Sequence, residues 1–297
     1  MRARFNGADA RVTRGERLCT KSVTTRPQRL PDRIRTEKRI QSAAMTFDVA
    51  AGAYDRFMGR YSSRLSPQLA DLADLQAGQR VLDVGCGPGA LTAELVARLG
   101  ADSVAAVDPS EPFVAAARER YPGVDVQHAS AEQLPYSDGA FDATLAQLVV
   151  HFMPDPVAGL RELARVTRRD GIVAVSVWDY AGERAPLTPF WRAALELDKH
   201  AVDESGLPGA RAGHLTELLE AAGLTSVEET ELGAACEFST FDEWWEPFTF
   251  GIGPTGDYAK RLDDARRTEL RERCRQLLPE PPFTLQTFAW AARGRVS

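Results

Sequence analysis

The chain has 297 residues, of which 44% are hydrophobic and 26% are charged, and its formal net charge is −6. This balance is typical of a globular protein that can bury a core, and the excess of acidic residues does not favour a nucleic-acid partner. No apolar run reaches the roughly 18 residues that a membrane span needs, so we expect a soluble, cytoplasmic protein.

The first 44 residues differ from the rest in charge. They hold 12 lysines and arginines and 4 acidic residues, a net of +8, whereas the remainder has a net of −14. They also lack apolar periodicity, so they cannot bury enough surface to offset their ordering entropy. We therefore expect a basic, disordered extension over 1–44 and one folded domain over 45–297. A basic arm for nucleic acid, a targeting peptide, and translation from Met45 remain alternatives for this segment.

From Gln79 onward, short apolar runs alternate with helical periodicities. Strands are predicted at 80–85, 103–110, 124–130, 143–150 and 172–178, with helices at 89–100, 111–121 and 156–167 between them. Such alternation predicts an α/β fold with a parallel sheet, helices on both faces, and a ligand at the carboxyl ends of the strands. Beyond Trp178 the pattern predicts helices at 189–201, 212–223 and 257–278, and strands at 224–232 and 283–294.

The stretch "GCGPGA" (85–90) follows the first predicted strand and fits the glycine pattern of dinucleotide-binding turns. Asp108 ends the second strand, where an acid binds ribose hydroxyls. These two features alone leave an NAD-dependent oxidoreductase open. Asp83, two residues before Gly85, favours another ligand, because a carboxylate there would repel a pyrophosphate and suits a cationic group. The alternative for both acids is a purely structural role.

Four segments, in this order along the chain, resemble the class I S-adenosylmethionine-dependent methyltransferases. They are "VLDVGCGPG", "AVDPS", "AEQLPYSDGAFD" and "LRELARVTRRDGIVAVSVW". The resemblance runs from about Phe47 to Trp178 and is greatest to the small-molecule branch that includes the ubiquinone and menaquinone C-methyltransferases. It implies a three-layer, Rossmann-like, doubly wound sheet of seven mostly parallel strands with the last one antiparallel. A helical cap would be inserted at about 178–211 and 236–281.

The resemblance also implies S-adenosyl-L-methionine as the cofactor. Asp83, with the backbone at Gly85 and Gly87, would hold the methionine amino group, and Asp108 would accept hydrogen bonds from both ribose hydroxyls. Gly87 and Gly89 would let the ligand approach the backbone. The other expected contacts are Cys86 in the turn, Pro109 and Ser110 beside the adenine, Ser130, Ala131 and Glu132 at its edge, and Gln147 at the methionine end.

One expected contact residue departs from the family pattern, and the cysteines suggest no chemistry of their own. Ser130 stands where the family often has an aspartate, which puts one adenine contact in doubt. Cys86 is expected to be a small packed residue rather than a nucleophile. The four cysteines form no C-x-x-C pair and the chain has four histidines, so no metal site and no disulfide framework is expected.

The helix before the first motif resembles the family's lid over the ligand. Tyr54 would cover the site, and Arg60 would pair with the methionine carboxylate. His151, just past the fourth strand, is the candidate general base for an acceptor that must lose a proton, the alternative being a packed ring.

The aromatic residues of the cap suit a small apolar or aromatic acceptor, unless they only form the core of a helical subdomain. We therefore predict methyl transfer from S-adenosyl-L-methionine to a small organic molecule. The alternatives are an NAD-dependent oxidoreductase and a cofactor-binding protein without catalysis.

Overall fold

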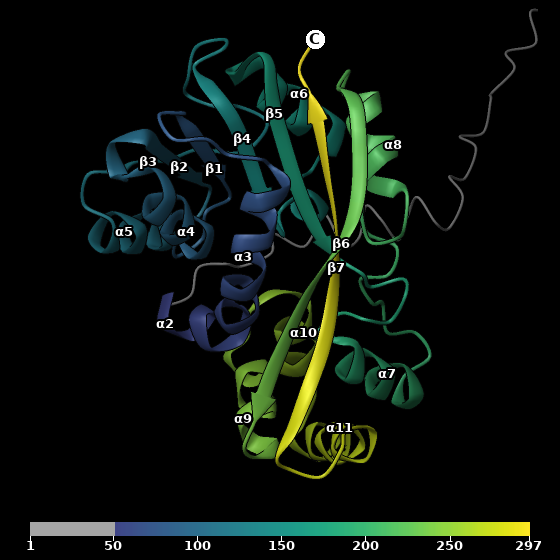
Figure 1. Cartoon of the computed structure of the whole chain (residues 1–297). Helices are drawn as coiled ribbons and strands as arrows, with labels where there is room; N and C mark the ends of the chain where they lie inside the picture. Colours follow the sequence, from purple (N-terminus) through teal and green to yellow (C-terminus); the bar gives the residue numbers. More distant parts are fainter. Residues whose placement is uncertain (1–50) are drawn as a thin grey trace, which may run out of the picture.

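The structure is a computed structural model that describes residues 51–297. The predicted basic extension over 1–44 lies outside the described residues. Seven strands form one sheet in the order β3-β2-β1-β4-β5-β7-β6 (Figure 1). They are β1 (Val81–Val84), β2 (Val104–Asp108), β3 (Asp125–His128), β4 (Phe141–Gln147), β5 (Thr167–Trp178), β6 (Thr225–Phe238) and β7 (Phe283–Arg295).

All neighbouring strands from β3 to β5 are parallel, and β7 runs antiparallel to both β5 and β6. The predicted doubly wound α/β sheet with an antiparallel last strand is therefore confirmed. The chain leaves β1 toward β2 in one direction and returns to β4 on its other side. Such a switch in strand order opens a crevice at the carboxyl ends, where α/β proteins bind ligands.

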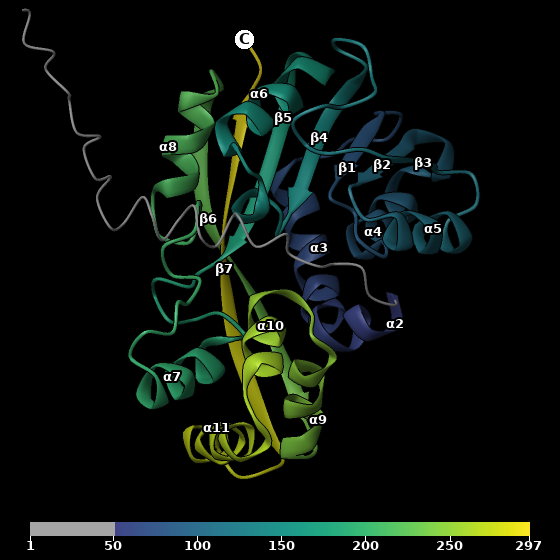
Figure 2. The ribbon, with the colours of Figure 1, turned by 180° about the vertical axis from the view of Figure 1, so that it is seen from behind.

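Helices cover both faces of the sheet, which gives the expected three layers. The helices of the sheet region are α2 (Ala51–Tyr54), α3 (Arg60–Leu72), α4 (Ala90–Leu99), α5 (Glu111–Arg120), α6 (Pro156–Val166) and α8 (His214–Ala221). One core contains Val81 and residues of α3, α4 and α5, whereas Leu82 and Val84 belong to a second core with α6 and α8. Figure 2 shows α6 and α8 on the face turned away in Figure 1. Alternate residues of β1 thus enter opposite cores, as expected of a strand buried on both sides.

β6 and β7 are longer than the sequence pattern predicts. They stay paired as far as Phe238 and Phe283, beyond the parallel strands. Four helices gather around these extensions, below the carboxyl ends of β4 and β5 in Figure 1. They are α7 (Thr188–Leu197), α9 (Phe241–Trp245), α10 (Gly253–Arg261) and α11 (Asp264–Leu277). We call this part of the molecule the cap.

One predicted cap helix is wrong in its bounds. The single helix expected over 257–278 is two helices, because the Asp263 side chain accepts a hydrogen bond from the Arg266 N–H (2.8 Å) and begins α11 anew. Thr240 is the N-cap residue of α9, since its side chain accepts from the Glu243 N–H (3.1 Å), while the Glu243 carboxylate accepts from the Ser239 N–H (2.9 Å).

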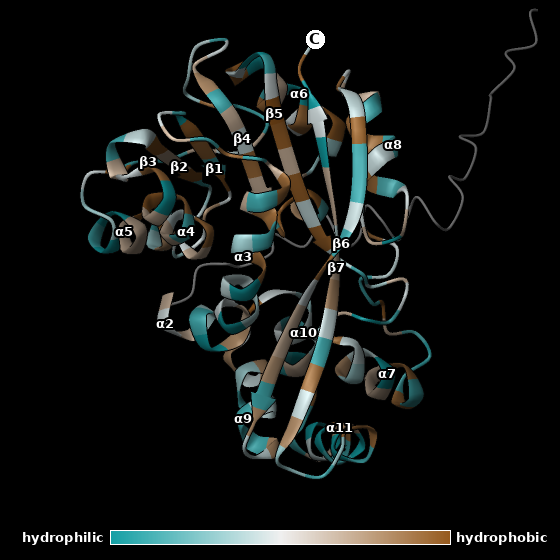
Figure 3. Ribbon diagram, viewed as in Figure 1, coloured by the Kyte–Doolittle hydropathy of each residue, from teal (hydrophilic) through white to brown (hydrophobic). Residues whose placement is uncertain are grey.

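The cap has an aromatic interior. Phe190 of α7 stacks on Phe248 with ring centroids 4.8 Å apart, and Trp244 lies 4.7 Å from the same ring. These rings belong to the same core as α3 and α4. Figure 3 shows the hydrophobic colour concentrated on β1, β4 and β5, whereas the part of β6 beside α8 is hydrophilic. Several aromatics predicted as an acceptor wall therefore pack as cap interior. None of the helices between residues 51 and 297 has the length and hydrophobicity to traverse a lipid bilayer.

Candidate functional site

The glycine turn between β1 and α4 leaves one position open to a ligand. Gly85, Gly87 and Gly89 all have positive φ angles, of 71°, 54° and 103°. A Cβ at Gly85 would lie 2.4 Å from a Val149 methyl, and one at Gly89 would lie 2.3 Å from the Tyr121 ring. A Cβ at Gly87 would meet only Tyr54, at 3.9 Å. Packing of the chain itself thus accounts for Gly85 and Gly89, whereas Gly87 faces free space under Tyr54.

Two buried acids flank this turn. Asp83 is 1% exposed and accepts a hydrogen bond from the Thr92 hydroxyl (2.7 Å), and burial raises the pKa of its carboxyl to about 7. Asp108 accepts from the Gly87 N–H and the Ser110 N–H, both at 2.8 Å. Burial also raises its pKa, although these two backbone bonds act in the opposite direction.

No ion pair to either acid is recorded among residues 51–297. Burying two charged carboxylates without a partner costs free energy. A ligand that brings a cationic group to Asp83 and hydroxyl donors to Asp108 would reduce this cost, because a nearby cation and hydrogen-bond donors each stabilise an ionised carboxylate. A pyrophosphate at the same place would add negative charge beside two acids.

A lid covers the turn. It consists of α2, the π-helical turn η1 (Asp55–Gly59) and the start of α3. The Tyr54 ring packs edge-on against Phe113 with centroids 5.0 Å apart, and burial and the nearby Asp108 raise the pKa of its hydroxyl above its ordinary value. Arg120 fastens this lid, since it donates to the Pro88 carbonyl (3.1 Å) and to the Asp55 carboxylate (2.6 Å). The sequence did not indicate Arg120, because its partner lies 65 residues away.

The residues predicted around the adenine lie on two adjacent loops. The Ala129 N–H donates to the Asp108 carbonyl (3.1 Å) and joins the loop after β3 to that after β2. The Pro109 carbonyl oxygen lies 2.8 Å from Nε2 of His128, within hydrogen-bond distance. Ser110 is the N-cap residue of α5. On the other loop Ser130 is exposed, Ala131 is buried, and Glu132 carries a buried Oε1 without a hydrogen-bond partner in the described part of the chain.

The end of β4 lies against the same turn. Gln147 donates to the Ser62 carbonyl of α3 (3.1 Å), and Leu148 follows with a φ of 61°, rare for a branched residue. This bend places Val149 against Gly85 and turns His151 inward. His151 is 2% exposed, and burial lowers the pKa of its imidazole to about 3. The ring is therefore neutral at ordinary pH.

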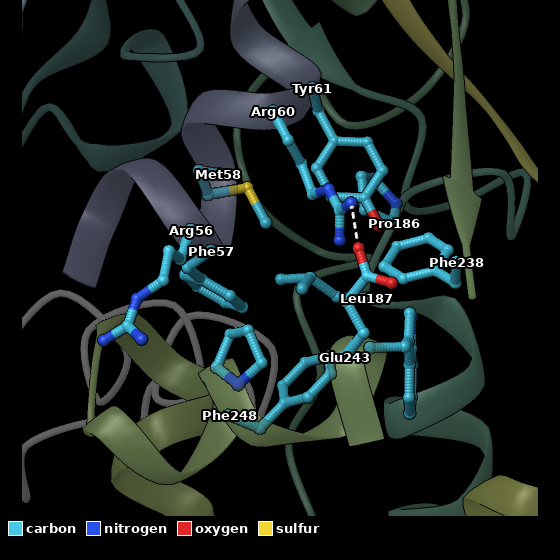
Figure 4. Close-up of a pocket in the computed structure, with 12 residues that line it drawn as sticks. Arg56, Phe57, Met58, Arg60, Tyr61, Pro186, Leu187, Phe238, Glu243 and Phe248 are labelled. Atoms are coloured by element: carbon cyan, nitrogen blue, oxygen red, sulfur yellow. Dashed lines mark hydrogen bonds and ion pairs between the residues drawn. The ribbon is translucent and has the colours of Figure 1, made fainter. Parts of the chain in front are cut away.

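Two predicted residues are placed differently from the rest. Arg60 points into the cap, where it pairs with Glu243 (2.7 Å), donates to the Glu237 carbonyl (3.2 Å) and lies over the Phe238 ring (Figure 4). The structure thus does not bring Arg60 to the acids of the turn. Cys86 is buried, and burial and the two acids raise the pKa of its thiol well above the ordinary value, which suits a packed residue.

A second hollow lies between the lid and the cap. This cap pocket is open to solvent, and the empty space within and in front of it amounts to about 390 Å³. It is lined by Tyr54, Phe57, Met58, Leu148, His151, Phe152, Trp178, Tyr180, Leu187, Glu204, Ile252, Gly253, Pro254 and Thr255. Tyr54 separates it from Gly87, so the pocket adjoins the glycine turn. Glu204 is a buried acid that the sequence did not indicate, because it lies in an irregular segment with no motif.

Comparisons with known proteins identify the domain. Residues 82–175 match the model of a methyltransferase domain. The chain is 35% identical to a Mycolicibacterium smegmatis protein named "Probable S-adenosylmethionine-dependent methyltransferase" over 163 aligned residues. The aligned region covers 54% of this chain and 56% of the relative. The chain is also 31% identical over 166 residues to the demethylmenaquinone methyltransferase of Paenarthrobacter aurescens, covering 54% and 62%.

A solved structure shows the same fold. A chain of the complex between the Haloferax volcanii Trm112 methyltransferase activator and a methyltransferase has a TM-score of 0.55 at 17% identity, over 86% of this chain and 99% of that one. The fold is thus the Rossmann-like fold of the methyltransferases. Residues 82–175 are a methyltransferase domain, and the resemblance predicted from the sequence is confirmed. The chain spans less than two thirds of either curated relative.

Proposed function

We propose that this protein binds S-adenosyl-L-methionine and transfers its methyl group to a small organic acceptor. One observation carries the proposal: two buried acids that have no ion-pair partner between residues 51 and 297 flank a glycine turn in which Gly87 is the glycine that is open to a ligand. When bound, the cofactor supplies a methyl group already activated by a sulfonium. The protein therefore has to bind, orient and exclude water.

Each residue of the turn has a task that its chemistry fits. The Asp83 carboxylate holds the methionine ammonium, which compensates its buried charge. Each Asp108 oxygen already accepts one backbone N–H and retains a lone pair for a ribose hydroxyl. Tyr54 and Phe113 form an apolar cover that keeps water from the site.

The acceptor binds in the cap pocket. Its walls are mostly apolar and aromatic, so the acceptor is an apolar or aromatic small molecule. His151 lines this pocket with an imidazole that is neutral at ordinary pH. With a pKa of about 3 in the empty pocket it is a weak base, so a general-base role requires that the bound acceptor stabilises the imidazolium.

The test compares S-adenosylhomocysteine with NAD in thermal unfolding and calorimetric titration. Binding to the native state alone at 100 times Kd stabilises by about 2.7 kcal/mol, which is several degrees for a domain of this size. We expect stabilisation by S-adenosylhomocysteine and not by NAD. Asp108→Asn should weaken binding at least about tenfold, since a bond to a charged group contributes about 1.5–3 kcal/mol.

Asp102→Asn, which makes the same chemical change on an exposed loop, is the control and should bind like the wild type. Stabilisation by NAD alone would overturn the proposal in favour of an oxidoreductase. Tight binding of S-adenosylhomocysteine without methyl transfer to any member of a panel of phenols, amines and enols would favour a binding protein without catalysis.

A further inference from the structure

Glu204 is a buried carboxylate on the wall of the cap pocket. Its side chain comes from the irregular segment between α7 and α8 and is 1% exposed. The Trp191 indole N–H donates to its Oε2 (2.8 Å), and this bond and the neighbouring Tyr180 hydroxyl lower the pKa of the carboxyl against the larger effect of burial. Its Oε1 has no hydrogen-bond partner among the described residues. One side of the carboxylate is thus held by the protein, and the other is left for a donor.

Within residues 51–297 Glu204 forms no salt bridge, and Arg192, which lines a neighbouring hollow with it, pairs with Glu183 instead. Burial raises the pKa of its carboxyl to about 7, and Asp203 adds to this effect. A buried acid with one unsatisfied oxygen destabilises the folded state, since an apolar side chain of similar size would avoid the cost. The cost is recovered where a ligand supplies the missing donor.

Two further unsatisfied polar groups lie on the same pocket. They are Nδ1 of His151 and the hydroxyl of Thr255, both buried and without a partner in residues 51–297. A hydroxyl group on a ligand can donate to Glu204 and accept from Thr255, whereas an ammonium can only donate. A second cation beside the sulfonium of the cofactor would also be repelled.

We propose that Glu204 selects the acceptor: the cap pocket takes a ring-containing apolar molecule whose hydroxyl group donates a hydrogen bond to its Oε1. This inference rests on the proposed function and assigns the substrate class of that site. A pocket built to bind a hydroxyl rejects an analogue without the donor more strongly than an apolar pocket discriminates by size. Glu204 therefore acts as a specificity residue, held in place by Trp191.

The experiment uses three naphthalene probes, chosen for the apolar and aromatic walls of the cap pocket. The probes are 2-naphthol, 2-methoxynaphthalene, which keeps the oxygen but lacks the donor, and 2-naphthylmethylamine, which is cationic. Each is titrated calorimetrically into the full chain, with and without saturating S-adenosylhomocysteine. We expect 2-naphthol to bind the wild type at least about tenfold more tightly than either other probe.

Glu204→Gln should remove this preference. Trp191 still needs an oxygen acceptor, so the new side-chain amide would turn its NH2 group to the pocket. The ratio of 2-naphthol to 2-methoxynaphthalene affinity should then fall to about one or reverse, while S-adenosylhomocysteine affinity stays the same. Glu196→Gln, the same change on the exposed side of α7, is the matched control and should keep the wild-type ratio.

The outcomes separate the two proposals. Equal binding of 2-naphthol and 2-methoxynaphthalene by the wild type overturns the assignment of Glu204, and so does tighter binding of the amine or failure of all three probes to bind. A wild-type ratio that survives in Glu204→Gln means that Glu204 only anchors Trp191, and this result also overturns the assignment. Failure of S-adenosylhomocysteine to bind contradicts the proposed function instead, and the titrations without it still decide the role of Glu204.

Discussion

The site combines buried charges that work against the stability of the empty protein. Asp83 and Asp108 are each buried with raised pKa values, and neither has an ion-pair partner in the described part of the chain. A carboxyl group whose pKa rises from 3.8 to about 7 on folding holds its proton more tightly in the native state. Its contribution to stability is complete below about pH 4 and is lost as the pH rises through 7.

Asp83→Asn should therefore stabilise the empty protein at high pH. The amide keeps an acceptor for Thr92 but carries no charge, so at pH 8 the variant should unfold at a higher denaturant concentration than the wild type. The upper limit of the difference is about 4 kcal/mol, from about 1.4 kcal/mol per pKa unit. At pH 4 the two proteins should be alike, and S-adenosylhomocysteine should bind the variant at least about tenfold more weakly.

Urea titrations at pH 4, 6 and 8 measure this dependence, and calorimetry measures the affinity. A wild type that is more stable than the variant at pH 8 would show that Asp83 is compensated by a group we have not identified. Loss of stability together with unchanged affinity would make Asp83 a structural residue only.

At the scale of single elements, the glycines in the turn between β1 and α4 serve different purposes: one is required by packing of the chain, and another leaves room for a ligand. A methyl group at Gly85 would strike both methyls and the Cβ of Val149, which a branched side chain cannot move aside easily. A methyl group at Gly87 would meet almost nothing of the protein, at a similar positive φ. The two positions therefore differ in surroundings and hardly in backbone strain.

We expect Gly87→Ala to cost about 1 kcal/mol of stability, the strain of a left-handed residue, and yet to abolish measurable binding of S-adenosylhomocysteine. Gly85→Ala should cost clearly more stability, because the overpacked contact adds to the same strain. Thermal unfolding with and without the ligand measures both effects. Wild-type affinity in Gly87→Ala would mean that no ligand lies over this turn.

Local signals explain which elements could be predicted from the sequence. The strands β1 to β5 and the helices between them are each encoded by a short periodic run with its own turn, and Asp83, Asp108 and the glycines lie inside such motifs. The extension of β6 and β7 depends on pairing between residues more than 40 positions apart, such as Phe238 with Phe283. No local pattern encodes that pairing, so the shape of the cap could not be foreseen.

The site residues that the sequence did not indicate were missed for the same reason. Arg120 contacts Asp55 and Pro88, Glu204 contacts Trp191, and these partners meet only in the folded chain. His151 was found because it follows a strand end, whereas the strained Leu148 that turns it inward has no sequence signature.

At the scale of the whole molecule, lid, sheet and cap enclose two adjoining spaces. The glycine turn lies on the sheet side of Tyr54 and the cap pocket on the other. Arg60 connects lid and cap, because it starts α3 and pairs with Glu243 of α9 across 183 residues of sequence. Figure 4 shows this pair beside the Phe238 ring. Arg60 is therefore placed to hold the cap against the lid.

Arg60→Ala should loosen the cap and leave cofactor binding nearly unchanged. The ion pair is partly exposed and contributes at most about 1 kcal/mol of global stability, to which the lost contacts with the Glu237 carbonyl and the Phe238 ring add. Amide hydrogen exchange in α9 should become faster, because local opening no longer breaks this contact. Glu243→Gln should speed exchange in the same helix, and Arg211→Ala, which breaks an exposed pair with Glu217, should not. S-adenosylhomocysteine affinity should stay within about twofold in all three. If affinity instead falls tenfold in Arg60→Ala but not in Glu243→Gln, Arg60 binds the methionine carboxylate after all, and the lid must rearrange when the cofactor enters.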